Sequence, residues 1–541
     1  MTKKLITLLI FFVTVNGQNL DSLYNQLMFI TNHIDYKNNS VTSNYVNKCG
    51  LGIVGEIRKN INQFSISKQN EINSLLSRPN TEKSIVSPKG LFRIHYDETG
   101  NNAIGYDINE LAIAFDSAYT FEVTKLGFLP PPSDNGLGGD DLYDVYVQNL
   151  GSGIYGFTDP ENEVSSGLYS SYIMIDNDFG AGFPTKGIDA ARVTAAHEFH
   201  HAIQLGNYSS NFSDLYYFEI TSTAMEEFVY DDINDYYNYL HSFFADPTKP
   251  LYYAQGSNVG YNRAIWNIYL SKIFGMDIIK STWESMRNFS AIESIASAIG
   301  DRGSSFKNVF NEFATWLWFT GSRAVPNEFF KEAENYPQVK VQATYQLSPT
   351  EITFNANHIS NEFLLFVNNQ NDSLVVIVSE CDINSAITSP NSTNNYKVNL
   401  TSSTESGDIK IADNYFISVS LGGTNAGMFE TSSILNNTLQ NGNGTLNEIE
   451  FPYPQPFLYS KYNNIFLPVS RKSDGSAELY VYSSDMNLVF SESLNVFLIN
   501  NALLKWNAKD NNGNKLPSGV YYFVTQSNDN IKKGKIVIIN D

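Results

Sequence analysis

The feature that most restricts the fold of this chain is a change in the spacing of its apolar residues near Pro337. Up to about Ala324, the apolar residues of many segments recur every three or four positions, which is the period of an α-helix. Beyond Pro337 they alternate in short runs bounded by Asn, Ser and Gly, as in EFLLFVNN and SLVVIVSE, which is typical of β-strands. Because the two patterns follow one another along the chain, the sequence predicts an α+β protein.

The half before this change mixes strands with helices. SPKGLFRIHYD, YDVYVQNL and SSYIMIDND alternate like strands, and the stretch YDINELAIAFDSAYTFEVTKLGF has a long helical pattern. From Gly187 to about Ala324 the pattern is mainly helical, with GYNRAIWNIYLSKIFG and SSFKNVFNEFATWLWFTGSR as its clearest segments. We therefore expect a mixed sheet followed by a helical half.

A chain of 541 residues is too long for one ordinary core, so several domains are expected. The polar stretch NNTLQNGNGTLNE has nothing to bury and separates two β-rich parts. The predicted organisation is a signal peptide at 1–17, an N-terminal helical, propeptide-like segment at 18–86, a mixed α+β domain at 87–336, a β-sandwich at 337–435, a linker at 436–450 and a second β-sandwich module at 451–541.

The N-terminus and the charge predict an exported protein. Lys3 and Lys4 precede an apolar run that is long enough for a secretory signal peptide but too short to span a bilayer. No later segment has the roughly 20 apolar residues of a transmembrane helix. The formal charge of −21 would repel nucleic acid and anionic lipid, which argues against both as partners. We expect a secreted or cell-surface protein.

The stretch TAAHEFHHAIQ concentrates three of the seven histidines of the chain. On a helix, His197 and His201 lie one turn apart on the same face and can bind one metal ion. Glu198 lies about 100° further around the helix, where its carboxylate can reach a water on the metal without being a ligand. His200 points away from this face and is expected to pack or to orient a neighbour. The arrangement H-E-x-x-H is that of zinc peptidases.

A catalytic zinc ion needs three protein ligands and one open position. The run FEITSTAMEEF begins a second helical pattern after a connection long enough for the chain to return beside the first helix. Glu219 is the predicted third ligand. The competing carboxylates are Asp214, Glu226 and Glu227, and Glu226 could instead accept the free ring N–H of a ligand histidine.

Five segments together resemble a family of secreted bacterial metallopeptidases of the gluzincin type, in which a glutamate on a second helix completes a zinc site of two histidines and one glutamate. They are GGDDLYDVYV, YIMIDNDF, RVTAAHEFHHAIQ, FEITSTAMEEFVYDD and GYNRAIWNIYLSKIFG, and the resemblance covers roughly Ser87 to Arg323. The chain departs from the family pattern at Ile220 and Ala224, where Gly and Trp are usual.

The resemblance implies a zincin-like domain that hydrolyses peptide bonds of a protein or peptide substrate. One Zn²⁺ ion would be held by His197, His201 and Glu219, and Glu198 would act as the general base. Tyr261 is a candidate donor to the oxyanion by analogy, although a buried structural tyrosine is the alternative. Two further alternatives are a degenerate zincin that binds protein or glycan through its β-domains, and a surface adhesin whose zinc is structural.

Three other features carry predictions. The YIMIDND strand is expected at the edge of the sheet, where a substrate strand could add to it. The loop DNGLGGDDLYD suits Ca²⁺, with carboxylates from Asp134, Asp140, Asp141 and Asp144. Cys49, in KCG, has three alternatives: a thiolate ligand that keeps the enzyme silent, a disulfide to Cys381, or a buried free thiol.

The C-terminal module resembles the type IX secretion sorting domain and the related FlgD-like immunoglobulin fold, over roughly Phe451 to Asp541. The resemblance rests on PQPF, Trp506, the D-NNG turn and Ser518-Gly519-Val520-Tyr521. It implies that this module is recognised by secretion machinery or attaches the protein to the cell surface.

Overall fold

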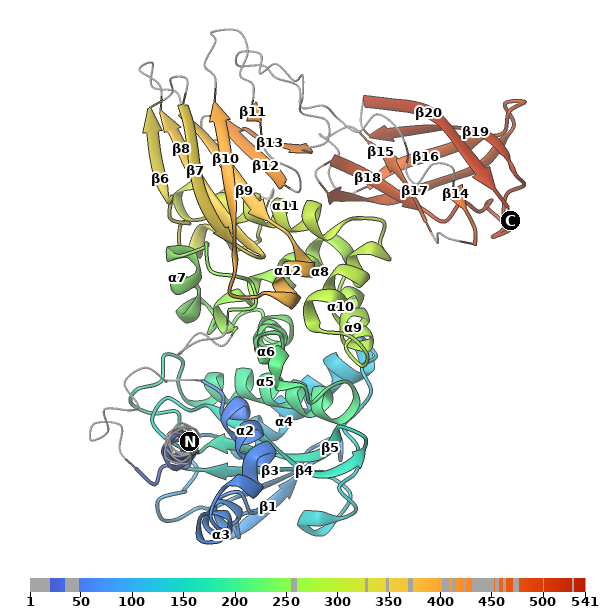
Figure 1. The fold of residues 1–541 in the computed structure, drawn as a ribbon. Helices are drawn as coiled ribbons and strands as arrows, with labels where there is room; N and C mark the ends of the chain where they lie inside the picture. Colours follow the sequence, from blue (N-terminus) through green and yellow to red (C-terminus); the bar gives the residue numbers. More distant parts are fainter. Residues whose placement is uncertain are drawn as a thin grey trace, which may run out of the picture. The chain divides into compact units, whose positions relative to one another are not determined.

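A computed structural model of the protein describes residues 20–34, 48–253, 260–325, 329–346, 350–367, 373–400, 409–410, 415–421, 425–430, 452, 457–460, 464–469, 476–499, 501–527 and 530–540. The predicted signal peptide at 1–17 and linker at 436–450 lie outside these residues. The chain forms two compact units and contains both α-helices and β-strands (Figure 1). Among the described residues, every helix is too short or too polar to cross a membrane.

The first unit is built on a mixed sheet of five strands, whose order is β1-β2-β3-β5-β4. Strands β2, β3 and β5 run parallel to one another, whereas β1 and β4 are antiparallel to their neighbours. The strands are β1 (Lys83–Val86), β2 (Phe92–Tyr96), β3 (Tyr143–Gln148), β4 (Gly156–Ser165) and β5 (Leu168–Asp176). The predicted mixed sheet is therefore present.

Strand β4 is an edge strand of this sheet, and the prediction that YIMIDND forms the edge is wrong. That sequence is the end of β5, which pairs with β3 on one side and β4 on the other. The sequence did not predict strand β4, because the second half of this strand is polar and exposed and because it contains Pro160. A proline is tolerated in a strand mainly at a sheet edge, where its missing N–H removes no ladder hydrogen bond.

One face of the sheet is covered by two helices. Helix α5 (Gly187–Asn207) packs against β4 and β5, and helix α4 (Ile108–Tyr119) packs against α5 and β2. A π-helical stretch continues α4 through Lys125, so the long predicted helix is nearly complete. Helix α6 (Leu215–Val229) follows a short connection and packs against α5, as the spacing of the two helical patterns predicted.

The opposite face of the sheet is covered by the N-terminal segment. Residues 20–30 are helical, and α2 (Leu51–Asn60) and α3 (Ile66–Leu75) follow. Their apolar side chains, including Ile53 and Ile72, share one buried cluster with Tyr172 and Met174 of β5. The described residues of the predicted propeptide-like segment are therefore part of the core of the first unit.

The second unit contains helices as well as sheets. It comprises Phe243–Leu251, Tyr269–Ser285 and Ile292–Asp541, so it takes in α9 (Asp277–Ser285) and α11 (Phe306–Trp318). The sequence placed these helices in the domain before residue 337. The difference has a packing reason, because α11 packs against the sheet strands β9 (Ser373–Glu380) and β12 (Tyr415–Leu421).

Two sheets follow α11 in the second unit. The smaller has the order β11-β10-β7 and the larger β13-β12-β9-β8-β6. Their remaining strands are β6 (Ala343–Gln346), β7 (Thr350–Asn357), β8 (Ser360–Val367), β10 (Thr393–Leu400), β11 (Ile409–Lys410) and β13 (Asn425–Glu430). Two sheets over this range agree with the β-rich module predicted there.

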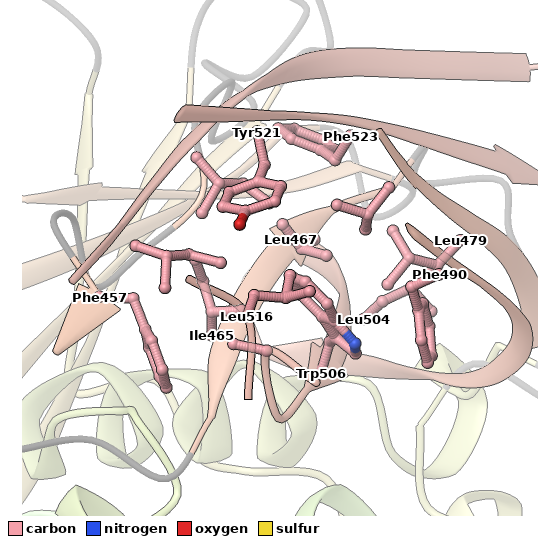
Figure 2. Close-up of a cluster of buried hydrophobic side chains, with 14 of the residues drawn as sticks. Phe457, Ile465, Leu467, Leu479, Phe490, Leu504, Trp506, Leu516, Tyr521 and Phe523 are labelled. Carbon is pink, nitrogen blue, oxygen red and sulfur yellow. The ribbon is translucent and has the colours of Figure 1, made fainter. Parts of the chain in front are cut away.

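The C-terminal module is one continuous seven-stranded sheet folded around a single core, and not two separate sheets. Strand β17 (Leu488–Ile499) pairs first with β16 (Ser476–Tyr482) and then with β18 (Asn501–Trp506), which makes the sheet continuous. Figure 2 shows side chains from several of these strands directed into the core. The sheet is completed by β14 (Phe457–Leu458), β15 (Ile465–Pro468), β19 (Gly519–Ser527) and β20 (Asn530–Ile539).

A Phe523→Ala substitution is expected to destabilise this module by about 3–5 kcal/mol, because it leaves a cavity in a fully buried core. Phe523 is 0% exposed and lies opposite Gly534 in the pairing of β19 with β20. Hydrogen exchange of peptides from β19 and β20 would measure the change. An exposed residue of β19, Tyr522, provides the control, and equal effects of Tyr522→Ala and Phe523→Ala would contradict the prediction.

Candidate metal centre

The packing of α5 against α6 brings together three predicted ligands. His197 and His201 project from successive turns of α5, and their Nε2 atoms lie 3.1 Å apart. Glu219 of α6 faces them, with its Oε2 atom 3.1 Å from His197 Nε2 and 3.5 Å from His201 Nε2. The structure therefore places two imidazoles and one carboxylate around a common point.

The spacing of these atoms matches a tetrahedral metal site. Zinc bonds of 2.0–2.1 Å at tetrahedral angles place neighbouring nitrogen or oxygen donors about 3.3 Å apart. The three donor–donor distances of 3.1–3.5 Å agree with this spacing. The residues present thus fit a zinc ion.

The charge at this point also favours a cation. Burial alone would lower the pKa of His197, but hydrogen bonds to Glu219 and Glu226 raise it to about 9. Burial would raise the pKa of Glu219, but the two histidines lower it to about 2. The surroundings of the two histidines and the carboxylate therefore favour positive charge between them, and a divalent ion would supply that charge.

Neighbouring side chains fix the orientation of both rings. His197 Nδ1 lies 2.7 Å from Oε1 of Glu226, and His201 Nδ1 lies 2.7 Å from Oε1 of Gln204 and 3.1 Å from the hydroxyl of Ser222. Such partners keep the proton on Nδ1 and leave Nε2 free to bind metal. Glu226 thus takes the orienting position that was one of its two predicted alternatives, and it is not in the donor group.

Cys49 supplies a fourth donor. Its thiol sulfur and the donor atoms of His197, His201 and Glu219 all lie within 4.8 Å of one another, and all four residues are buried. Burial, with the neighbouring Glu198 and Glu219 carboxylates, raises the pKa of the thiol. Cys49 and Cys381 are both free cysteines, so the disulfide alternative is wrong.

Glu198 lies beside this donor group without belonging to it. Its Oε2 atom accepts a hydrogen bond of 2.9 Å from the hydroxyl of Thr158 on β4, which fixes the carboxylate against the sheet. Burial raises the pKa of Glu198 despite the two histidines nearby. A buried carboxylate with a raised pKa is suited to accept and return a proton.

Tyr261 is close to the centre, but its hydroxyl has a local partner. It accepts a hydrogen bond of 3.1 Å from the backbone N–H of Cys49, and its ring centroid lies 6.1 Å from that of His197. Gly260 precedes it with φ of +132°, and a Cβ atom there would lie 2.3 Å from the carbonyl oxygen of Tyr216. The close passage of this backbone beside α6 therefore requires glycine and positions Tyr261.

Lys48 is a residue that sequence reasoning missed. Its Nζ atom lies 2.6 Å from Oε2 of Glu226 and 2.5 Å from Oδ2 of Asp235, and the side chain is 1% exposed. Burial would lower the pKa of Lys48, but the two carboxylates raise it. No sequence signal connects Lys48 with Asp235, although its position next to Cys49 could have drawn attention to it.

The remaining candidates lie elsewhere. His200 Nδ1 lies 2.7 Å from Oε2 of Glu122, which agrees with the predicted packing role. Within the described part of the chain, the donor group includes neither Asp214 nor Glu227. In the proposed calcium loop, Arg78 pairs with Asp134 and Asp144, and Arg93 pairs with Asp140. Three of the four carboxylates thus form ion pairs with arginines, and binding of Ca²⁺ by this loop stays a prediction.

No protein-family model matches the chain, and no curated protein matches it. Among solved structures, the chain is similar to PorZ, an essential bacterial surface component of the type IX secretion system of Porphyromonas gingivalis. The two sequences are 14% identical, the match covers 34% of this chain and 31% of PorZ, and the TM-score is 0.14. Dimeric latent PorU from the same organism is 10% identical to the chain, the match covers 37% of this chain and 19% of PorU, and the TM-score is 0.15. Neural ectodermal development factor IMP-L2 is 10% identical to the chain, the match covers 37% of this chain and 89% of IMP-L2, and the TM-score is 0.12. The chain thus spans about a third of PorZ and a fifth of PorU, and scores this low carry no argument.

Proposed function

We propose that the protein is an exported zinc-dependent endopeptidase that is latent in the chain as it stands. The observation that carries the proposal is the convergence of His197, His201 and Glu219 at tetrahedral spacing, with Glu198 buried beside them. A site that only stored or bound zinc would not need Glu198. The same observation argues against a degenerate zincin that acts as an adhesin.

The residues of the chain have distinct roles in this proposal. His197, His201 and Glu219 would hold the ion, which when bound polarises the substrate carbonyl and acidifies water. Glu198 takes a proton from the attacking water as its oxygen adds to the carbonyl carbon, and returns it to the amine as the C–N bond breaks. Thr158 holds the carboxylate in place.

Cys49 makes the full chain latent. A catalytic zinc ion needs one position open to water, whereas Cys49 would complete a set of four protein donors. The side chains at the centre are also shielded, since Cys49, His197, Glu198, His201 and Glu219 are at most 2% exposed. Activity therefore requires that the Cys49 thiol leave the donor group, which would also remove the contact that anchors residues 48–50 at the centre.

The same four donors favour one competing function, a structural zinc site. Structural sites are usually closed by four protein ligands, and cysteine with histidine is a common combination. The two functions make opposite predictions for removal of the Cys49 thiol, which the Discussion develops.

Export and surface attachment are part of the proposal on sequence grounds. The signal-like residues 1–17 support export, and the sorting-like features of residues 451–541 support recognition by secretion machinery.

A His197→Ala substitution is expected to lower zinc affinity by more than about 100-fold, since loss of even an orienting partner of a ligand costs 10–100-fold. Competition against a chromogenic chelator would measure the affinity of the purified full chain. His200→Gln is the matched control, because His200 lies on the same helix and pairs with Glu122 outside the donor group. Equal zinc affinity for both variants would contradict the assigned ligand set.

A further inference from the structure

Residues 48–50 lie along the outer side of the edge strand β4, like an added strand, and are buried there. The N–H of Tyr155 donates to the carbonyl of Lys48 over 2.8 Å, and the N–H of Gly50 donates to the carbonyl of Gly156 over 2.9 Å. Cys49 pairs with Gly156 in a parallel bridge at the start of β4. Edge strands bind extended peptides through backbone hydrogen bonds of this kind, with pockets for alternate side chains giving specificity.

The side chain before Cys49 fills a closed acidic pocket next to the metal centre. The ammonium group of Lys48 contacts Glu226 and Asp235 and lies 4.7 Å and 5.4 Å from the ring centroids of Tyr155 and Tyr239. The hydroxyl of Tyr155 also donates to Asp235 over 2.9 Å. Two carboxylates and two aromatic faces are the features that recognise a long cationic side chain.

The walls of this pocket do not depend on the strand that occupies it. Glu226 belongs to α6, Tyr155 immediately precedes β4, and Tyr239 belongs to α7 (Tyr237–Ala245). When residues 48–50 withdraw, the two carboxylates remain beside the centre without the lysine that balances them. Buried carboxylates without a counterion are costly, so the vacated pocket favours another cation.

We propose that residues 48–50 hold the position of a substrate strand and that the Lys48 pocket selects a lysine or arginine side chain adjacent to the scissile bond. This inference rests on the proposed peptidase function and adds its substrate class. The position follows from Cys49, which places its thiol among the metal donors while Lys48, its direct neighbour, enters the pocket. The preferred substrates are therefore basic peptides in an extended conformation.

The first test measures cleavage by a full chain that carries Lys48→Ala and Cys49→Ala, so that both the centre and the pocket are vacated. Two fluorogenic peptides would differ at one position only, with lysine in one and methionine in the other. The lysine peptide is expected to have a kcat/KM about 10- to 100-fold higher, as for hydrogen bonds between charged groups. Mass spectrometry would locate the cut next to the lysine. Equal cleavage of both peptides would overturn the inference while leaving the peptidase function intact.

Asp235→Asn in the same background tests the pocket directly. The variant removes one negative charge, so the ratio of kcat/KM for lysine to that for methionine is expected to fall by about 10-fold. The ratio is internal to one enzyme preparation, so a general loss of activity does not change it. An unchanged ratio would show that Asp235 does not read the basic side chain and would overturn the assigned pocket.

The second test needs no enzymatic activity. The Lys48→Ala chain is expected to bind n-butylammonium in the vacated pocket and to show a saturable rise in its thermal unfolding midpoint, roughly 3–5 °C at ten times Kd. The control ligand is 1-butanol. The control variant is Arg58→Ala, which removes a cation from another buried carboxylate, that of Asp159. Stabilisation of Lys48→Ala alone, without cleavage by any variant, would support the cationic pocket and refute the peptidase function. The assignment of a cation-binding pocket would be overturned if both variants showed the same rise in unfolding midpoint, or if n-butylammonium and 1-butanol raised it equally.

Discussion

In a chain that already carries Cys49→Ala, Glu198→Gln is expected to reduce kcat/KM on denatured casein by about 100- to 10,000-fold. General acid–base catalysis by one side chain contributes about 10²–10⁴-fold, and a glutamine cannot accept the proton of the attacking water. The substitution keeps the shape of the side chain and an oxygen that can accept the hydrogen bond of Thr158. Zinc content, measured by elemental analysis, is expected to stay unchanged because Glu198 is not a donor.

Glu122→Gln is the matched control for this experiment. It makes the same chemical change at a buried glutamate that contacts His200 and lies outside the donor group, so it is expected to leave zinc content and most activity in place. A chelator provides the second control, since it removes the ion from every variant. Equal cleavage by the Glu198 variant, the parent chain and the chelated protein would refute the metallopeptidase function.

Cys49→Ala is expected to convert the full chain from background activity to cleavage at least about 100-fold above it. Alanine offers no donor, so it leaves the fourth position of the ion to water, as a catalytic site requires. His197, His201 and Glu219 would retain one equivalent of zinc. Casein cleavage and elemental analysis of the same preparation would measure both results.

Cys381→Ala is the control for Cys49→Ala, because Cys381 is the other free cysteine of the chain and lies in the second unit. It is expected to leave the chain latent. If Cys49→Ala lost its zinc and gained no activity, the closed set of four donors would be a structural site. That outcome would reject the peptidase in favour of its competitor.

Parts of the centre were predictable because they depend on local geometry. The 3.6-residue period of a helix places His197 and His201 on one face wherever the helix packs. Glu219 was predictable because a short connection makes α6 return beside α5. The face of α6 that turns toward α5 decides between Glu219 and Glu227, and the spacing of residues along the sequence does not by itself fix that face.

Other parts of the centre depend on contacts between distant residues. Lys48 and Asp235 are 187 positions apart, and nothing in the pattern of either segment indicates their pairing. The edge position of β4 depends on the strand order β3-β5-β4, in which β5 lies between two strands that precede it in the sequence. Alternation of apolar residues predicts that a strand exists, but it does not encode which strand lies outermost.

The shared core of the N-terminal segment and the sheet has a consequence for how the enzyme would mature. Ile53, Ile72 and their neighbours cover the face of β5 opposite the α5 side, so discarding the whole of residues 18–86 would expose that face to water. The mature enzyme would therefore keep α2 and α3 as permanent structure. Maturation would amount to the displacement of a few residues around Cys49, and the two forms would differ little in mass or in secondary structure.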